Sequence, residues 1–266
     1  MITAEQQSLI DALSRLVSAE PGVEAAWLAG SLGKGLGDEF SDVDLLLLVA
    51  EGAVADVSTA LVKGLDQVTK PVLVNKLFGG RVISVVTDDW DRFDLSLVGP
   101  ADLARYNSAE LTSLFNRTGR APPLRPDTPY QTPPETLLKL VQEFFRVLGL
   151  LPSALGREEY ELGLRGVDLL RGMTLDLMLE ENGISPTKRG GALHRRPFLN
   201  ADQLEDLATI PPQAAERRSV IEANRAIAAI FLPRARRLAE TVGMPWPTEF
   251  EDATRRNLKS RLQLDI

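Results

Sequence analysis

The chain has 266 residues, of which 44% are hydrophobic and 25% are charged, and its formal net charge is −7. This length suits two modest domains, and the acidic balance lacks the basic footprint of a general nucleic-acid binder. The sequence contains no cysteine and a single histidine, His194. These counts exclude disulfides, thiolate zinc sites and clusters of histidine ligands. We therefore expect any metal ion to sit on oxygen ligands, which favours Mg²⁺ or Mn²⁺.

The N-terminal segment MITAEQQSLIDALSRLV has no basic stretch followed by an apolar core, so it does not read as a signal peptide. No apolar run approaches the roughly 20 residues that a bilayer-spanning helix needs. We therefore expect a cytoplasmic protein that has neither a membrane nor a nucleic acid as its partner.

Residues 3–18 predict an amphipathic helix in which Thr3 and Gln6 have the spacing of a capping box. Apolar strands and helices then alternate up to residue 115. In chain order we expect a strand at 23–29, a short helix starting near Ser31, a buried strand at 43–49, a helix at 54–70, and strands at 72–77, 81–87 and 92–98. The stretch at 101–115 is expected to be helical or partly so. Gly79-Gly80 and the polar segment 87–91 are expected to turn between the last three strands.

A proline-rich segment separates two regions of different character. Six of the 17 prolines lie between Pro122 and Pro134, a density that no helix or central strand tolerates. We therefore place a linker at 122–134, between an N-terminal domain at 1–121 and a C-terminal domain at 135–266. The fold class expected is an α/β (α+β) domain with a small mixed sheet, followed by an all-α helical domain.

Four helices are expected after the linker, at 135–150, 158–181, 203–210 and 217–242. Asn182-Gly183 is a helix-ending signal for the second of them. Pro233 is expected to kink or split the last one, because proline removes a backbone donor and its ring clashes with the preceding turn.

Two aspartates stand at the entrance of the apolar strand at 43–49, in the sequence Ser-Asp-Val-Asp. Side chains alternate along a strand, so Asp42 and Asp44 point to the same face, with their Cα atoms about 6–7 Å apart. Two carboxylates at that separation can share a divalent cation, and without one they repel each other. The pair is therefore a candidate metal site.

Asp94 is the candidate third ligand, because a bare carboxylate inside the strand at 92–98 needs a compensating partner. Asp88, Asp89 and Asp91 compete for this role. Their position in the polar segment 87–91 explains them as turn residues without any function.

Gly30-Ser31 supplies a candidate phosphate site ahead of the aspartates. Glycine lets the backbone approach a phosphate closely, and backbone N–H groups at a helix start together with the Ser31 hydroxyl suit a triphosphate. Lys34 is close enough in sequence to add a positive charge. Neither the P-loop pattern nor the dinucleotide-binding glycine pattern is present.

Gly30-Ser31, about ten further residues and then Asp42-Val43-Asp44 ahead of an apolar strand resemble the signature of the nucleotidyltransferase superfamily with a polymerase-β-like core. The plan of two domains is similar to that of the antibiotic nucleotidyltransferases, and within them to the lincosamide nucleotidyltransferases. The segments GGALHRRPFLN and FLPRARRLAETVGMPWP share this similarity. At the level of motifs the resemblance covers residues 27–49 and 81–98.

The resemblance implies Mg²⁺ or Mn²⁺, with ATP or another nucleoside triphosphate as co-substrate. It implies transfer of a nucleoside monophosphate, AMP in the first place, to a hydroxyl of a small molecule such as a lincosamide or an aminoglycoside, with release of pyrophosphate. Asp42, Asp44 and Asp94 would be the catalytic metal ligands, with Asp94 also a candidate base for the acceptor hydroxyl. A homodimer is compatible with the resemblance, although no residue pattern shows one.

Two alternatives stay open. In the first, the acceptor is a partner protein such as a toxin. The length of the helical domain argues against this, because family members that modify proteins tend to be shorter. In the second, the chain binds a nucleotide without catalysis. The presence of all three aspartates argues against this. His194, in the basic sequence Leu-His-Arg-Arg, is expected to be an exposed loop residue, with contact to nucleotide phosphates as the other interpretation.

Overall fold

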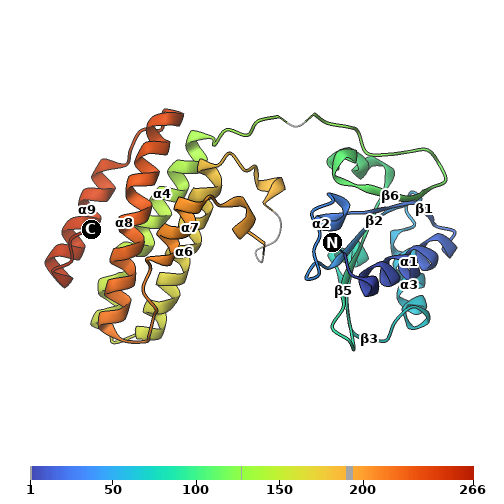
Figure 1. The fold of residues 1–266 in the computed structure, drawn as a ribbon, viewed down its shortest axis with the longest axis horizontal. Helices are drawn as coiled ribbons and strands as arrows, with labels where there is room; N and C mark the ends of the chain where they lie inside the picture. Colours follow the sequence, from blue (N-terminus) through green and yellow to red (C-terminus); the bar gives the residue numbers. More distant parts are fainter. Residues whose placement is uncertain (1, 127, 190–193) are drawn as a thin grey trace. The chain divides into compact units, whose positions relative to one another are not determined.

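The computed structural model describes residues 2–126, 128–189 and 194–266 (Figure 1). The chain forms two compact units, Met1–Asp127 and Thr128–Ile266, each with its own hydrophobic core. The division between them falls inside the proline-rich segment. Among the described residues, no helix combines the length and the apolar character needed to cross a membrane.

The first unit is built on one mixed sheet of six strands in the order β3-β4-β5-β2-β1-β6. The strands are β1 (Val23–Leu28), β2 (Val43–Val49), β3 (Pro71–Leu77), β4 (Val82–Thr87), β5 (Arg92–Val98) and β6 (Thr112–Asn116). Strands β2 and β5 pair in parallel, and every other neighbouring pair is antiparallel. This arrangement confirms the small mixed sheet predicted from the sequence.

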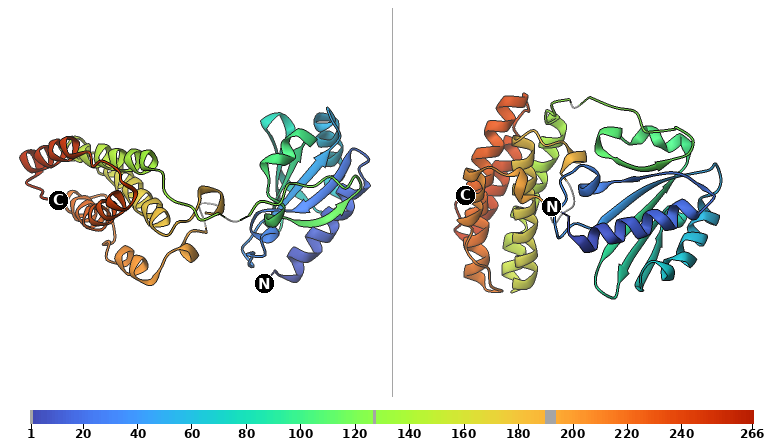
Figure 2. Two further views of the ribbon diagram at one scale, coloured as in Figure 1. Left: turned by 90° about the horizontal axis from the view of Figure 1, so that it is seen from above. Right: turned by 45° about the vertical axis from the view of Figure 1, so that its right-hand side comes forward.

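Two helices cover one face of this sheet, α1 (Ala4–Ala19) and α3 (Val54–Gly64) (Figure 2). The capping box predicted at the start of α1 is present, with the side chain of Thr3 accepting from the backbone of Gln6 and the side chain of Gln6 accepting in return. Residues 43, 45, 47 and 49 of β2 point into the core that α1 and α3 close. Alternation therefore turns residues 44, 46 and 48 to the opposite face.

The stretch predicted to be helical or partly so at 101–115 is helical only in two short turns and ends in a strand. Short 3₁₀ turns at Pro100–Arg105 and Ser108–Glu110 cover one end of the opposite sheet face, where Leu103 belongs to a small apolar cluster with Trp27 and Leu46. The chain then forms β6, which pairs with the free edge of β1. Strand pairing satisfies the backbone groups of β1 that would otherwise be left open, and this tertiary demand outweighs the weak helical pattern.

The second unit is a helical bundle, which confirms the all-α prediction for this half. Its helices are α4 (Pro134–Gly149), α5 (Leu151–Gly156), α6 (Tyr160–Glu181), α7 (Ala201–Ala208), α8 (Arg217–Val242) and α9 (Thr248–Leu262). The rings of Phe144 on α4 and Phe231 on α8 stack in its core at 3.7 Å between centroids. Gly183 adopts φ +66° just after α6, as the helix-ending signal predicted.

The sequence analysis missed α5 and α9, and of the two effects expected of Pro233, a kink or a split, the split is wrong. Helix α8 runs unbroken through Pro233, whose own side chain is exposed. Phe231, Leu232 and Ala235 on either side are buried, and this packing outweighs the backbone hydrogen bond that proline removes. Of the segment GGALHRRPFLN, residues 190–193 lie outside the described part of the chain.

Candidate active site

Asp44 and Asp94 stand directly opposite each other on two neighbouring parallel strands. Asp44 on β2 is in register with Asp94 on β5, and strands in a sheet lie about 4.8 Å apart. Both side chains belong to the sheet face that α1 and α3 leave open, because their neighbours Leu45 and Leu95 are buried in the core on the other side. The fold thus places two carboxylates side by side that are 50 residues apart in the sequence.

Asp42 lies just before β2, at the end of a loop that the first helix holds in place. The side-chain amide of Gln6 donates to the backbone carbonyls of Asp38 and Ser41, at 2.9 and 2.7 Å. The Asp38 carboxylate also accepts from the backbone of Phe40 at 3.0 Å. Gln6 is buried, so these hydrogen bonds fix the loop that carries Asp42 into the strand.

The environment of Asp44 concentrates negative charge. Burial, followed by the charges of Asp42 and of Asp94, raises the pKa of Asp44 to about 6, while the guanidinium of Arg92 acts in the opposite direction. A pKa raised by burial and by like charges means that ionising Asp44 is unfavourable unless a positive charge joins it. The residues therefore fit a divalent cation on oxygen ligands.

No group of three histidine or acidic side chains in the described ranges is gathered tightly enough to hold a metal ion by itself. Mg²⁺ commonly takes one or two carboxylates and completes its coordination with water and substrate phosphates. The opposed pair of Asp44 and Asp94, with Asp42 beside it, has that composition. The role of all three as metal ligands stays a prediction.

Gly30 lies against Asp44 so closely that no side chain fits at this position. Its φ is +59°, and a Cβ atom built on it would stand 1.9 Å from Oδ2 of Asp44. The backbone N–H of Ala29 donates to the carbonyl of Asp44 at 2.8 Å and holds the end of β1 to the start of β2. Gly30 is thus required for two reasons, a left-handed backbone and the space that Asp44 occupies.

Ser31 follows in the first turn of α2 (Gly30–Gly33), a helix of only four residues. Lys34, at the end of this turn, forms an ion pair with Glu110, with 3.6 Å between its Nζ and Oε2. The structure thus places Gly30 against Asp44 at the start of β2, with Ser31 next in the chain, and gives Lys34 a carboxylate partner that phosphate would have to replace or supplement. Phosphate binding by the three residues remains a prediction.

The competing aspartates have local explanations. Asp88 accepts from Nζ of Lys70 at 2.8 Å, and Asp89 is exposed in the turn between β4 and β5. His194 is half-buried, with its ring edge-on to Phe198 at 6.5 Å between centroids in the helical unit. The expectation of an exposed loop histidine is therefore wrong in one respect, because the side chain is partly covered.

Sequence reasoning missed two polar residues that accompany the aspartates. Arg92 lies two residues before Asp94 on β5, so it shares the open face, and its charge acts on Asp44. Ser84 on β4 is in register with Asp94 on its other side. The alternation of Arg92, Asp94 and Ser96 with buried apolar residues was a signal that could have singled out Arg92.

Residues 7–101 match the model of a protein family described as Nucleotidyltransferase domain. This range contains Gly30, the aspartates at 42, 44 and 94, and the strands that position them. The N-terminal unit is a nucleotidyltransferase domain. The match ends before the helical unit, so the family says nothing about that part of the chain.

Two solved structures are similar to the whole chain rather than to the nucleotidyltransferase domain alone. An aminoglycoside 6-adenyltransferase from Bacillus subtilis is 14% identical, with a TM-score of 0.45, and the match covers 95% of this chain and 96% of that one. A nucleotidyltransferase-like protein from Exiguobacterium sibiricum is 15% identical, with a TM-score of 0.37, covering 98% and 89%. Neither likeness bears on the substrate. No curated protein sequence matches this chain.

Replacing Gly30 with alanine is expected to impair the nucleotidyltransferase domain through Asp44. The new Cβ would displace the Asp44 carboxylate, and the left-handed backbone would cost about 1–3 kcal/mol of folding free energy. We expect Gly30→Ala to lower nucleotidyl transfer about 10- to 100-fold, measured as pyrophosphate release by protein that still folds.

Gly35→Ala is the matched control. Gly35 has φ +70°, but a Cβ there meets no atom within 4 Å. This variant carries the backbone strain without the collision, so it should lose stability and keep its turnover rate. Equal losses of activity in the two variants would show that the contact between Gly30 and Asp44 does not matter.

Proposed function

We propose that this protein transfers a nucleoside monophosphate, AMP from ATP in the first place, to a hydroxyl group of a small molecule. The observation that carries the proposal is the direct opposition of Asp44 and Asp94 beside Gly30 in a nucleotidyltransferase domain. A lincosamide or an aminoglycoside antibiotic is the acceptor class proposed.

In the proposed reaction the acceptor oxygen attacks the α-phosphorus of the nucleotide. A bond forms between that oxygen and phosphorus, the bond from the α-phosphorus to the bridging oxygen breaks, and pyrophosphate leaves. The proton of the acceptor hydroxyl passes to a carboxylate, for which Asp94 is the candidate. The protein forms no covalent bond to the reactants in this scheme. Its contribution is to hold the acceptor oxygen, the α-phosphorus and the leaving oxygen in line and to neutralise the negative charge of the phosphates.

Asp42, Asp44 and Asp94 would hold the divalent cation, Mg²⁺ or Mn²⁺, which supplies charge neutralisation at the transferring phosphate when it is bound. Gly30 and Ser31 would leave room for the phosphates and offer backbone and hydroxyl donors to them. Arg92 would place a further positive charge on the open face of the sheet near Asp44. Gln6 would act as a positioning residue through the loop before Asp42.

The test is pyrophosphate release from each of the four common nucleoside triphosphates, with Mg²⁺ or with a chelator, across a panel of lincosamides and aminoglycosides. We expect release only when nucleotide, metal and acceptor are all present, and an acceptor heavier by one nucleoside monophosphate in mass spectrometry. Transfer of label from the nucleotide to a protein band would replace the small-molecule acceptor with a protein. Nucleotide binding without turnover on any acceptor would contradict the proposed transfer.

A further inference from the structure

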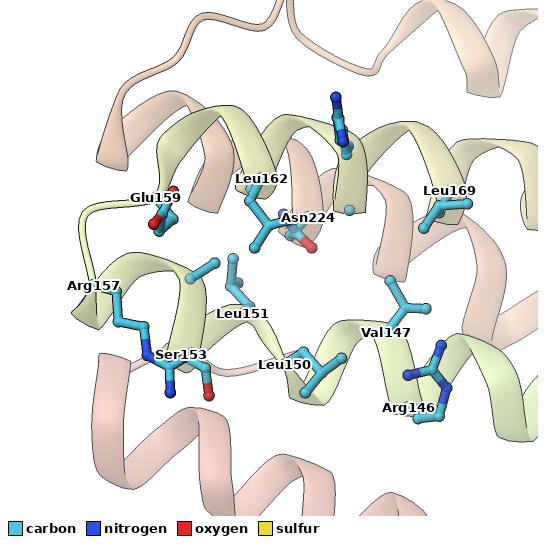
Figure 3. A pocket seen from close by; sticks show the side chains of 14 residues that line it. Arg146, Val147, Leu150, Leu151, Ser153, Arg157, Glu159, Leu162, Leu169 and Asn224 are labelled. Atoms are coloured by element: carbon cyan, nitrogen blue, oxygen red, sulfur yellow. The ribbon is translucent and has the colours of Figure 1, made fainter.

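The helical unit contains a cavity of about 320 Å³ that the proposed transfer does not use (Figure 3). The cavity lies between the end of α4, the short helix α5 and the first half of α6, and Asn224 of α8 forms part of its floor. Its volume is within the range of small-molecule sites.

The walls of this cavity are apolar and face solvent. Leu150, Leu162 and Leu169 line it and are 52%, 55% and 54% exposed, although such side chains are normally buried. Figure 3 shows Leu162 on one side and Leu150 on the other, with open space between them. A ligand with an apolar body would cover this surface and gain the free energy of its burial.

Asn224 places an unused hydrogen-bond acceptor at the bottom of the cavity. The residue is only 2% exposed, and its Nδ2 donates to the carbonyl of Val220 at 2.7 Å. This bond fixes the orientation of the amide, and no donor from the described residues reaches Oδ1. The oxygen is open to the cavity that Asn224 lines, so a ligand that donates a hydrogen bond to Oδ1 can replace water there.

The rim of the cavity is positively charged. Three guanidinium groups line it, from Arg146, Arg157 and Arg165, against one carboxylate, from Glu159. Arg146 is held by Glu143 through two hydrogen bonds of 2.6 Å. Arg157 and Arg165 form no ion pair with any described residue, so they remain available to an anion.

We propose that this cavity binds a small organic molecule with an apolar body, one anionic group and one hydrogen-bond donor. The apolar body would lie against Leu150, Leu162 and Leu169, the donor would reach Asn224, and the anion would pair with Arg157 or Arg165. The cationic rim disfavours a polycation such as an aminoglycoside. The site lies wholly within the helical unit, so the proposal stands or falls independently of the nucleotidyl transfer proposed above.

The probe is 8-anilinonaphthalene-1-sulfonate, which combines two aromatic groups, an amine donor and a sulfonate. Its matched neutral analogue, N-phenyl-1-naphthylamine, lacks only the sulfonate. Fluorescence titration of the full-length protein with each probe measures affinity. We expect saturable binding of one sulfonate probe per chain, about fivefold or more tighter than binding of the neutral analogue.

Gly166→Leu tests whether the cavity is the binding site. Gly166 lines it within α6, and a Cβ there meets no atom within 4 Å, so the backbone accepts a side chain and leucine would take up part of the cavity. Gly172→Leu is the matched control, because Gly172 is equally unobstructed on the same helix and does not line the cavity. Both substitutions raise helix propensity, and circular dichroism and thermal melts will verify folding.

We expect Gly166→Leu to weaken binding of the sulfonate at least about tenfold and Gly172→Leu to change it less than about twofold. Arg165→Gln should weaken the sulfonate about fivefold and leave the neutral analogue unchanged. Equal affinity in the two glycine variants, or no saturable binding to the unmodified protein, would overturn the proposed site. Equal loss of both probes in Arg165→Gln would overturn the anionic character assigned to its ligand.

Discussion

Replacing Asp44 with asparagine is expected to lower nucleotidyl transfer by about a hundredfold to a thousandfold while the protein keeps its fold. Asp44 lies opposite Asp94, and burial together with the charges of Asp42 and Asp94 disfavours its ionised form unless a cation is bound. Asparagine keeps the size of the side chain but removes the negative charge that would bind the metal and balance the phosphates. Losing one electrostatic contact of this kind typically costs two to three orders of magnitude in rate. Pyrophosphate release at saturating nucleotide measures the effect.

The chain offers a matched control for this substitution in its second Asp-x-Asp sequence, Asp89-Trp90-Asp91. Asp89 is exposed in the turn between β4 and β5, and the structure gives it no place opposite another carboxylate. Asp89→Asn should keep its rate within about twofold of the unmodified protein, as expected for a surface substitution. Full activity in Asp44→Asn would remove the aspartate pair from the mechanism.

Replacing Asp94 with asparagine is expected to have opposite effects on activity and on stability. Transfer should fall about as far as in Asp44→Asn, because the same pair is broken and the candidate base is lost. The metal-free protein should become more stable, because one of the charges that oppose ionisation of Asp44 disappears. At pH 8 with a chelator we expect a gain of about 1 kcal/mol, or about 3–5 °C in the melting temperature of the nucleotidyltransferase domain.

The pH dependence of this gain follows from the direction of the shift. The folded protein holds the proton of Asp44 more tightly than the unfolded chain does, because the pKa rises from its ordinary value of 3.8 to about 6 on folding. The stabilisation that this proton provides is complete below pH 3.8 and is lost as the pH rises through about 6. The advantage of Asp94→Asn should therefore shrink at pH 4.5.

Thermal melts of both proteins at pH 4.5 and 8, with chelator and then with excess Mg²⁺, measure these effects. Mg²⁺ should stabilise the unmodified protein at pH 8 more than it stabilises Asp94→Asn, since binding to the folded state alone raises the melting temperature. A variant that is less stable than the unmodified protein at pH 8 without metal would show that Asp94 contributes contacts that outweigh its repulsion of Asp44.

In the nucleotidyltransferase domain, the sequence by itself determined those helices and strands whose local residue pattern matches the burial found in the structure. The run of apolar residues in β2 has one interpretation, a strand buried on both faces, and the structure has that strand with the predicted bounds, Val43–Val49. The capping box of α1 is equally local, because Thr3 and Gln6 satisfy each other within one turn. Gly30, Asp42 and Asp44 were selected from the segment that leads into β2, and Asp94 was selected because a carboxylate inside a strand is unusual.

Only the tertiary structure decided which residues meet across the sheet. That Asp94 lies opposite Asp44, rather than one strand further away, depends on the parallel pairing of β2 with β5, which no local pattern encodes. The conversion of residues 112–116 from an expected helix to β6 has the same origin, because the free edge of β1 supplies its partner.

In the helical unit, tertiary structure determines more of the outcome than the sequence pattern does. Periodicity found the long helices, but the continuity of α8 through Pro233 depends on the burial of its neighbours. The cavity is invisible in the sequence, where Leu162 and Asn224 read as ordinary helix residues. The packing of α4, α5, α6 and α8 leaves Leu162 exposed and one oxygen of Asn224 unpaired, because a cavity depends on how several elements fit together.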